Sequence, residues 1–338
     1  MSLQKRILIP VILCLMISIS SIALILVRMA ERYLVDDMVN TQHDLVVQVE
    51  QNFSGLVEKA VDIVSTLNYN SALYKLVREG GASDQGTLSI QAEVRQIIED
   101  ARLFSPQQDF KVVLYDWYGN VYQSRTFAAF DAPVNVTVKD EPLASIVREK
   151  SQDIVWLGTR GSLYGTSAKE NVVQAIKSLN YNFPPDGVGL LVVEFGEQSL
   201  YNLYRGSLSR GNSIWLVDKG GKIISSSDRD AVGTISPFWQ PELAVSDTAA
   251  RHYEMPVNDQ HCIVTVKRNI NTGWYVVDVL SYEVMTEQTR AIAQTAGILI
   301  ALCLLVCVPA IWLALRMVIK PIRSLCSHMR SAGPQLEA

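Results

Sequence analysis

The sequence predicts an α+β protein in which a long N-terminal helix carries two antiparallel-sheet modules, flanked by two transmembrane helices. Three observations predict this class. Two runs without any charged residue, 7–27 and 291–315, are each long enough to cross a bilayer as a helix. Apolar residues recur at helical spacing from Glu31 to about Arg78. After that point the spacing becomes that of short strands, and one strand–turn–strand pattern occurs twice.

The two charge-free runs account for the positive mean hydropathy, +0.15, of a chain of 338 residues. Their presence argues against a purely cytoplasmic soluble protein, and their number argues against a polytopic transporter or channel. Lys5 and Arg6 precede the first run, as basic residues do in a signal peptide. Because no small-x-small cleavage site follows that run, we expect it to be an uncleaved membrane anchor.

The distribution of charge predicts the orientation in the membrane. Residues 28–290 contain 24 Lys+Arg and 33 Asp+Glu, whereas the two tails are basic. Basic flanks stay on the cytoplasmic side of a membrane. We therefore expect a two-span protein of the cell membrane, with both termini (residues 1–6 and 316–338) in the cytoplasm and residues 28–290 outside. The acidic outer region also argues against nucleic acid as a partner, since phosphates require a basic surface.

The long helix expected over residues 31–78 has a narrow apolar stripe with a repeat close to seven residues. Two interpretations of the stripe are open. It can pack against its own domain, or it can form the contact of a homodimer along the half nearer the membrane. We expect packing in the distal half, and both interpretations stand for the proximal half.

The two sheet modules are expected at about 87–207 and about 211–282. Each contains an apolar strand, an Asp, two residues, a Gly, one residue and a β-branched residue, first at Asp116 and again at Asp218, which is 102 positions later. That distance is the size of a small α+β domain. The other elements expected are a helix at 87–104, strands at 153–158, 171–178, 188–195, 261–267 and 274–280, and a short helix at 197–207.

The order of these elements resembles that of the double-Cache (dCache) extracytoplasmic sensor region of bacterial membrane receptors. The resemblance rests on the span, the long helix, the two Asp-x-x-Gly modules, the strand Gly273-Trp-Tyr-Val-Val277, the second span and then Lys320-Pro-Ile-Arg-Ser-Leu325. It implies PAS-like sheets in both modules. It also implies that residues 316–338 are the start of a HAMP linker, whose second helix is missing from the sequence.

The same resemblance implies a transmembrane signal receptor. A small extracellular ligand would bind the membrane-distal module, and the signal would pass through the second span and HAMP. The closest resemblance is to the input half of sensor histidine kinases of two-component systems. Alternatives are a membrane-tethered ligand-binding or adaptor protein without its own output, or the input half of a chemoreceptor, a cyclase or a transcription regulator.

Signatures of enzymes are missing from the sequence. It contains no Gly-rich phosphate loop before Lys-Ser/Thr, no His-Glu-x-x-His and no Gly-x-Ser-x-Gly. We therefore expect no enzymatic activity within the 338 residues, no cofactor and no metal. Four histidines are scattered singly, and His252 and His261 could face one another across a turn, although surface or core positions are the more ordinary interpretation.

The first module interleaves aromatic and polar residues, which is typical of a pocket for a small polar molecule. We expect a sugar, an organic acid or a similar molecule. Arg125 or Arg160 could bind a carboxylate through two parallel hydrogen bonds. Each aromatic residue, taken alone, can equally belong to the core. The expected ligand-binding residues are Tyr115, Tyr122, Arg125, Trp156 and Tyr164.

Overall fold

The computed structural model divides the chain into two compact units, one made of Met1–Asn40 with Tyr282–Ala338 and the other of Thr41–Ser281. The residues that the structure describes are 3–82, 87–103, 110–124, 153–161, 171–179, 188–208, 212–244, 249–257, 260–283, 290, 294–302, 305–307, 309–310 and 312–313.

In the first unit, residues 3–40 belong to helix α1 (Leu3–Asn68), and residues 294–302 are also helical. Among the described residues, no helix combines the length and the sustained apolar character that crossing a membrane requires. Several positions of the second charge-free run and the whole of 316–338, where a HAMP linker is expected, lie outside the described residues.

In the second unit, α1 packs against its own domain, as expected for its distal half. The apolar positions that repeat every three or four residues are buried, which places one stripe of the helix in the core. The buried stripe consists of Val46, Val49, Phe53, Leu56, Val57, Ala60, Ile63, Val64 and Leu67.

The expected helix over 31–78 is in fact two helices. α1 ends at Asn68, and α2 begins at Ser71 and runs to Ala82. The side chain of Asn70 explains the break, because its Oδ1 accepts a hydrogen bond from the backbone N–H of Leu73 at 3.0 Å. An Asn in this position caps the start of a new helix. α3 (Thr87–Leu103) then leads toward the first sheet.

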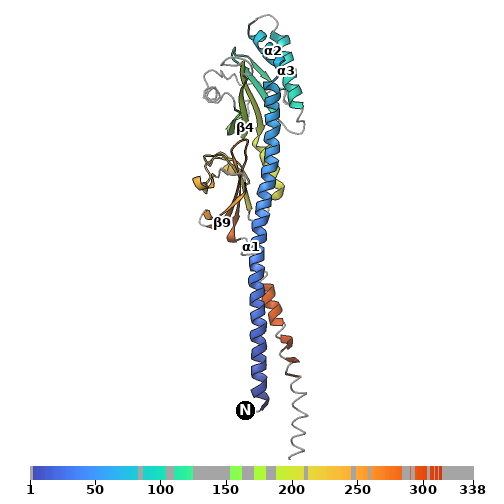
Figure 1. The fold of residues 1–338 in the computed structure, drawn as a ribbon, viewed down its shortest axis with the longest axis vertical. Helices are drawn as coiled ribbons and strands as arrows, with labels where there is room; N and C mark the ends of the chain where they lie inside the picture. The colour runs from blue at the N-terminus through green and yellow to red at the C-terminus, as the bar shows by residue number, and fades with distance from the viewer. Residues whose placement is uncertain are drawn as a thin grey trace, which may run out of the picture. The chain divides into compact units, whose positions relative to one another are not determined.

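Each module is one five-stranded antiparallel sheet, and the two sheets have equivalent strand orders. Both sheets lie alongside α1 (Figure 1). The first sheet has the order β2-β1-β5-β4-β3, and the second has the order β7-β6-β10-β9-β8. The first is built from β1 (Lys111–Asp116), β2 (Val121–Gln123), β3 (Val155–Gly161), β4 (Asn171–Leu179) and β5 (Gly189–Gly196). The second is built from β6 (Asn212–Val217), β7 (Ile223–Ser226), β8 (Arg251–Val257), β9 (Gln260–Arg268) and β10 (Tyr275–Ser281).

The repeated Asp-x-x-Gly pattern forms the same turn in both modules. Oδ1 of Asp116 accepts the backbone N–H groups of Tyr118 and Asn120 at 2.9 and 2.7 Å. Oδ1 of Asp218 accepts those of Gly220 and Lys222 at 2.8 and 2.9 Å. The glycine that follows three positions after each Asp has a positive φ, 99° in the first turn and 80° in the second. Both hairpins predicted from the sequence are therefore confirmed.

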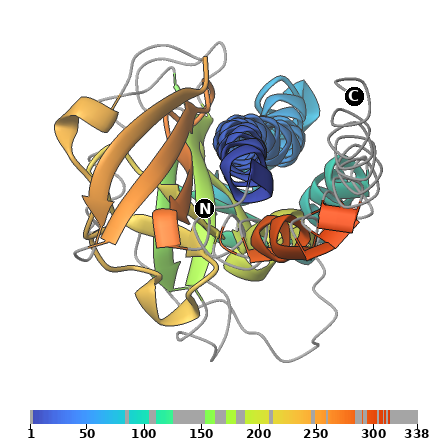
Figure 2. The same cartoon turned by 90° about the horizontal axis from the view of Figure 1, so that it is seen from below.

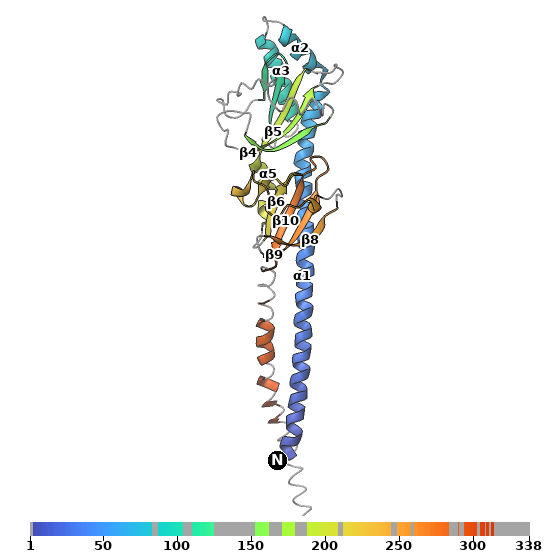
Figure 3. The same cartoon turned by 90° about the vertical axis from the view of Figure 1, so that its left-hand side faces the viewer.

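One core joins the two modules, because a face of each sheet packs with α1 (Figure 2). The opposite faces carry separate apolar clusters, one on each sheet. The connection between the sheets is the short helix α5 (Glu197–Tyr204) with the 3-10 turn η2 (Arg205–Ser207) (Figure 3). Further 3-10 turns, η3 (Arg229–Ala231) and η4 (Pro241–Leu243), follow β7.

Candidate ligand-binding site

Tyr115 lies on the face of the first sheet that points away from α1. Its neighbours along β1, Val112 and Leu114, belong to the core shared with α1, whereas Tyr115 packs in the separate cluster on the other side. The partly buried side chains of Trp117 and Leu157 pack against that cluster. The outer face of the first module is therefore aromatic and apolar around Tyr115.

A buried polar pair lies on the same outer face. Gln174 on β4 and Glu194 on β5 are opposite one another in register, and Nε2 of Gln174 donates a hydrogen bond to Oε2 of Glu194 at 3.1 Å. Both residues are almost fully buried, with exposures of 1 % and 0 %. The sequence analysis missed this pair. The one available signal was a charged residue inside the strand Leu190-Leu-Val-Val-Glu194-Phe, because buried carboxylates are rare without a partner.

Tyr122 lies on the opposite face, in the core shared with α1. Its hydroxyl donates a hydrogen bond to Oδ2 of Asp116 at 3.3 Å. Burial, together with the charge of Asp116, raises the pKa of Tyr122 above its usual value. This tyrosine holds the β1–β2 turn in the way that a core residue does.

Trp156 also lies on the side of α1, where its ring packs edge-on against Trp274 with the centroids 6.3 Å apart. The structure thus places Tyr115 on one face of the sheet and Tyr122 and Trp156 on the other. Arg125 and Tyr164 lie outside the described residues. The five residues as one ligand-binding set stay a prediction.

A cavity of about 650 Å³ opens beside Trp156, where the two modules meet. Its volume is in the range of pockets that bind small molecules. Four parts of the chain line it: α1, the start of β3 with the two residues before it, the β6–β7 turn and the β9–β10 turn. The lining residues are Val61, Asp153, Ile154, Val155, Trp156, Asp218, Lys219, Gly220, Asn271, Thr272 and Trp274.

The aromatic side of this junction cavity is held in place from α1. Trp274 stacks on Phe53 of α1 with the centroids 6.0 Å apart and an interplanar angle of 11°. On its other side it contacts Trp156 of β3. The three rings connect the long helix, the first sheet and the second sheet in one row.

The β9–β10 turn that lines the cavity is fixed by its own hydrogen bonds. Oδ1 of Asn269 accepts bonds from the backbone N–H and the hydroxyl of Thr272, at 3.0 and 2.9 Å. Gly273 has a φ of 69°, and a Cβ at this position would lie 2.7 Å from Cε of Lys219. The two turns on this side of the cavity therefore pack closely against one another, and the site is largely preformed.

The same Asn269 ties the turn to α1. Its Nδ2 donates hydrogen bonds to Oε1 of Glu50 at 3.0 Å and to Oγ of Ser54 at 2.7 Å. Glu50 also forms an ion pair with Lys267, with Oε2 and Nζ 3.3 Å apart. Besides the stacking of Trp274 on Phe53, this buried asparagine is thus a polar connection between the turn at the cavity and the long helix.

Charges of both signs surround the cavity. Asp153, Asp218 and Lys219 are in its lining. Lys177 on β4 interacts with Asp153, although burial is the larger effect and lowers the pKa of Lys177. Hydrogen-bonding groups of Asn271 and Thr272 lie among these charges. Such a lining suits a small polar molecule that also has an apolar face for the indole rings.

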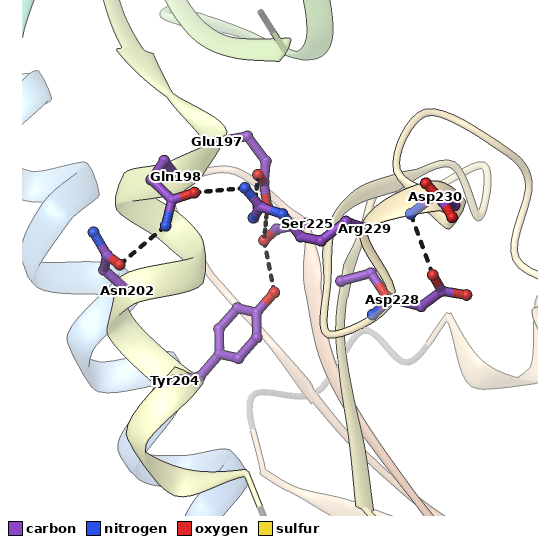
Figure 4. A network of polar contacts seen from close by, with 9 residues as sticks. Glu197, Gln198, Asn202, Tyr204, Ser225, Asp228, Arg229 and Asp230 are labelled. Carbon is purple, nitrogen blue, oxygen red and sulfur yellow. Dashed lines mark hydrogen bonds and ion pairs between the residues drawn. The ribbon is translucent and has the colours of Figure 1, made fainter.

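The helix α5 is bound tightly to the second module by a polar network (Figure 4). Glu197 accepts a hydrogen bond from Oγ of Ser225 at 2.6 Å and pairs with Nη1 of Arg229 at 2.6 Å. The hydroxyl groups of Tyr204 and Ser225 are 2.8 Å apart. Burial raises the pKa of Glu197, while Ser225 and Arg229 act in the opposite direction.

Comparison with known proteins gives a fold and no family. No protein-family model matches the chain, and no curated protein matches it. Solved structures do. The ligand-binding domain of the Pseudomonas fluorescens chemoreceptor CtaA, in complex with L-isoleucine, has a TM-score of 0.53 and 14 % identity, and the match covers 77 % of this chain and 98 % of that one.

Two further chemoreceptor domains are similar at the same level. That of Pseudomonas aeruginosa PAO1 PctB with L-Arg has a TM-score of 0.51 and 13 % identity over 73 % of this chain and 97 % of that one. That of Campylobacter jejuni Tlp3 with L-valine has a TM-score of 0.51 and 17 % identity over 76 % and 97 %. Two antiparallel sheets on one long helix, as in these ligand-binding domains, is the double-Cache fold, and this chain has that fold.

Proposed function

We propose that the chain is the sensing part of a transmembrane receptor that binds a small polar molecule outside the cell. The junction cavity is the observation that carries this proposal, because a ligand there would touch both modules and α1 at once. The fold supports it, since the three similar chemoreceptor domains were solved with the amino acids isoleucine, arginine and valine.

The mixed lining of the cavity suits a zwitterionic or uncharged ligand. Asp153, Asp218 and Lys219 are among the lining residues. Lys177 interacts with Asp153, and Oδ1 of Asp218 accepts two backbone N–H groups of its own turn, so neither carboxylate is an isolated charge. A zwitterion or a polyol can satisfy groups of both signs. The outer face around Tyr115, which is one of the five residues expected from the sequence, is the second place for the ligand.

The ligand acts by binding one arrangement of the modules better than another, and it can shift their equilibrium only by that difference in affinity. Two connections carry the change onward. Asn269 links the cavity to Glu50 on α1, and the network of Glu197 and Arg229 makes α5 move with the second sheet. The C-terminal helical segment that follows β10 then transmits the change.

The membrane topology is part of the proposal. Residues 7–27 and 291–315 span the membrane, both termini are cytoplasmic, and residues 28–290 are extracytoplasmic. The charge-free runs and their basic flanks support this arrangement. The receptor works as a homodimer. Its output is foremost that of a sensor histidine kinase reached through HAMP, with a chemoreceptor, a cyclase, a transcription regulator or a tethered adaptor as alternatives.

Thermal unfolding of the full chain tests which class of small molecule binds. L-amino acids, monosaccharides and dicarboxylic acids are added in turn, and one of the first two classes should raise Tm. At a concentration 100-fold above Kd the stabilisation is about 2.7 kcal/mol. Trp156→Ala should abolish the shift, whereas Tyr118→Ala, an exposed aromatic outside the cavity, should keep it.

Each other outcome has a defined meaning. If Trp117→Ala abolishes the shift and Trp156→Ala does not, the ligand binds the outer face of the first sheet. If only dicarboxylic acids act, the argument from charge is wrong. If no class acts, the sensing proposal fails. Protease added to intact cells tests the topology, and failure to cut residues 28–290 would contradict it.

A further inference from the structure

Asp278 is a buried carboxylate in the middle of the second sheet. It lies on β10 opposite Thr265 of β9, and Thr265 in turn lies opposite His252 of β8. The exposure of Asp278 is 0 %, and neither of its carboxylate oxygens has a hydrogen-bond partner of good geometry in the described part of the chain. A buried ionised group without a partner is costly, so this position requires an explanation.

Helix α1 packs over the inner part of this row, where Asp278 and Thr265 are fully buried, whereas His252 on the edge strand is exposed. The hydroxyl of Thr265 donates to Oε1 of Gln42, and Nε2 of Gln42 donates to the carbonyl of Ile263, both at 3.5 Å. Nδ1 of His252 lies 2.9 Å from the hydroxyl of Thr265. The ring of His43 on α1 lies over His252, with the centroids 5.5 Å apart. Polar contacts, some of them long, therefore hold this part of the helix on the sheet.

No cation pairs with Asp278 among the described residues. From α1, the titratable groups that face the sheet here are His43 and Glu50, and from β9 the group is Lys267, which is already paired with Glu50. The edge strand β8 contributes His252 and Glu254 on this face, and β6 contributes only the apolar Ile214 opposite Asp278. When its carboxyl group is protonated, Asp278 carries no charge, and its O–H group can donate a hydrogen bond to the acceptors around it.

The charges on Asp278 and His252 depend on pH. Burial raises the pKa of Asp278 to about 7, although Gln42 and the backbone N–H of Val279 oppose the shift. Burial also lowers the pKa of His252, and the charge of His43 lowers it further. Ionisation of Asp278 thus places an unpaired negative charge beneath α1, and protonation of His252 places a positive charge beside His43 at the edge of the sheet.

We propose that Asp278, Thr265 and His252 form a proton-dependent latch that holds residues 41–54 of α1 against the second sheet. The latch is closed when Asp278 is protonated and His252 is neutral, and it loosens when Asp278 loses its proton. The receptor then responds to pH in the membrane-proximal module, through the same helix that the ligand cavity reaches at Asn269. The latch does not depend on the identity of the ligand.

Hydrogen exchange of the full chain, followed by mass spectrometry from about pH 4 to about pH 8, tests the latch. After correction for the chemical exchange rate, the opening equilibrium of residues 41–54 should rise by up to about tenfold for each pH unit between about 4 and about 7, and it should level off above about 7, where Asp278 is ionised in both states. Asp278→Asn should remove this dependence. Asp62→Asn, an exposed position on the same helix, should retain it.

The latch is overturned if opening of residues 41–54 in the unmodified chain does not depend on pH, or if Asp278→Asn leaves the dependence intact. If Asp278→Asn does not fold, one measurement on the unmodified chain is still decisive. Its infrared spectrum should contain the carbonyl band of a protonated, buried carboxylic acid that disappears on titration through neutral pH. Absence of that band would equally overturn the proposal.

Discussion

Arg229 of η3 forms an ion pair with the buried Glu197 at the start of α5, with Nη1 and Oε2 2.6 Å apart. The guanidinium group also lies over the ring of Tyr201, 4.6 Å from its centroid, and donates to Gln198 at 2.5 Å. One side chain of the second module thus contacts three residues of the helix that leads out of the first. The two modules are connected by these contacts as well as by the chain itself.

Replacing Arg229 should therefore weaken the connection between the modules. Arg229→Leu leaves the Glu197 carboxylate buried without its cation, and we expect a loss of roughly 1–3 kcal/mol in the free energy of unfolding. Urea denaturation measures it. Lys75→Met, which removes an exposed pair with Glu79, is the matched control and should change stability by less than about 0.5 kcal/mol. Glu197→Gln can then be added to Arg229→Leu. If the double variant loses the same amount of stability again, the two residues act independently.

Gly273→Ala should destabilise the β9–β10 turn. Its φ of 69° is unfavourable for alanine, at a cost of about 1–2 kcal/mol, and the side chain of Lys219 must also move. Gly55→Ala is the contrasting variant, because that glycine lies inside α1 with open space around it. It should stabilise the protein by about 0.5–1 kcal/mol. Equal effects of the two changes on the urea midpoint would contradict the role of the turn.

Stability should fall as pH rises from about 4 to about 7. Burial raises the pKa of Asp278 to about 7 in the folded state, whereas in the unfolded chain it has the ordinary aspartate pKa of 3.8. The folded state binds more protons in this interval, so the free energy of unfolding decreases with pH, by about 4 kcal/mol in total. Asp278→Asn should flatten this part of the profile. A slope that persists in the variant would assign it to other groups.

His252 should produce a slope of the opposite sign. Its pKa is lowered in the folded state from the ordinary value of 6.5, so the unfolded chain takes up a proton first and stability falls as pH drops below about 6.5. His252→Gln should reduce this loss. His261→Gln is the control, because His261 is also exposed but lies opposite Pro256 and not beside Thr265. Equal effects of the two substitutions would show that the surroundings of His252 are not the cause.

Much of the fold could be predicted because the deciding interactions are local. The turns at Asp116 and Asp218 are closed by hydrogen bonds within five residues, so both hairpins could be recognised from the sequence. The strand β8 (Arg251–Val257) was missed. As an edge strand it carries exposed polar residues on one face, and its pattern is that of a loop. The register of this strand also decides between the two interpretations of the histidines. His252 lies opposite Thr265 and His261 lies opposite Pro256, so the two do not face one another, and the more ordinary interpretation holds.

The site was harder to predict because it depends on residues far apart in the chain. Trp156 could be selected as an aromatic residue among polar ones, but its neighbours in the cavity come from positions as distant as Val61 and Asn271. In the sequence, Asp278 stands between apolar residues, which is the ordinary alternation of a strand with one exposed face. Only the register of β8, β9 and β10 and the position of Gln42 show that it is enclosed.

The equivalent strand orders of the two sheets have an evolutionary consequence. Tandem duplication of a gene for a single five-stranded unit would produce this arrangement without any rearrangement of connections, and it would also account for the equivalent Asp–Gly turns at 116–119 and 218–221. After such a duplication, one copy is free to acquire a new specificity while its twin preserves the older one. A receptor that integrates two different chemical stimuli can arise in this way from an ancestor that recognised only one.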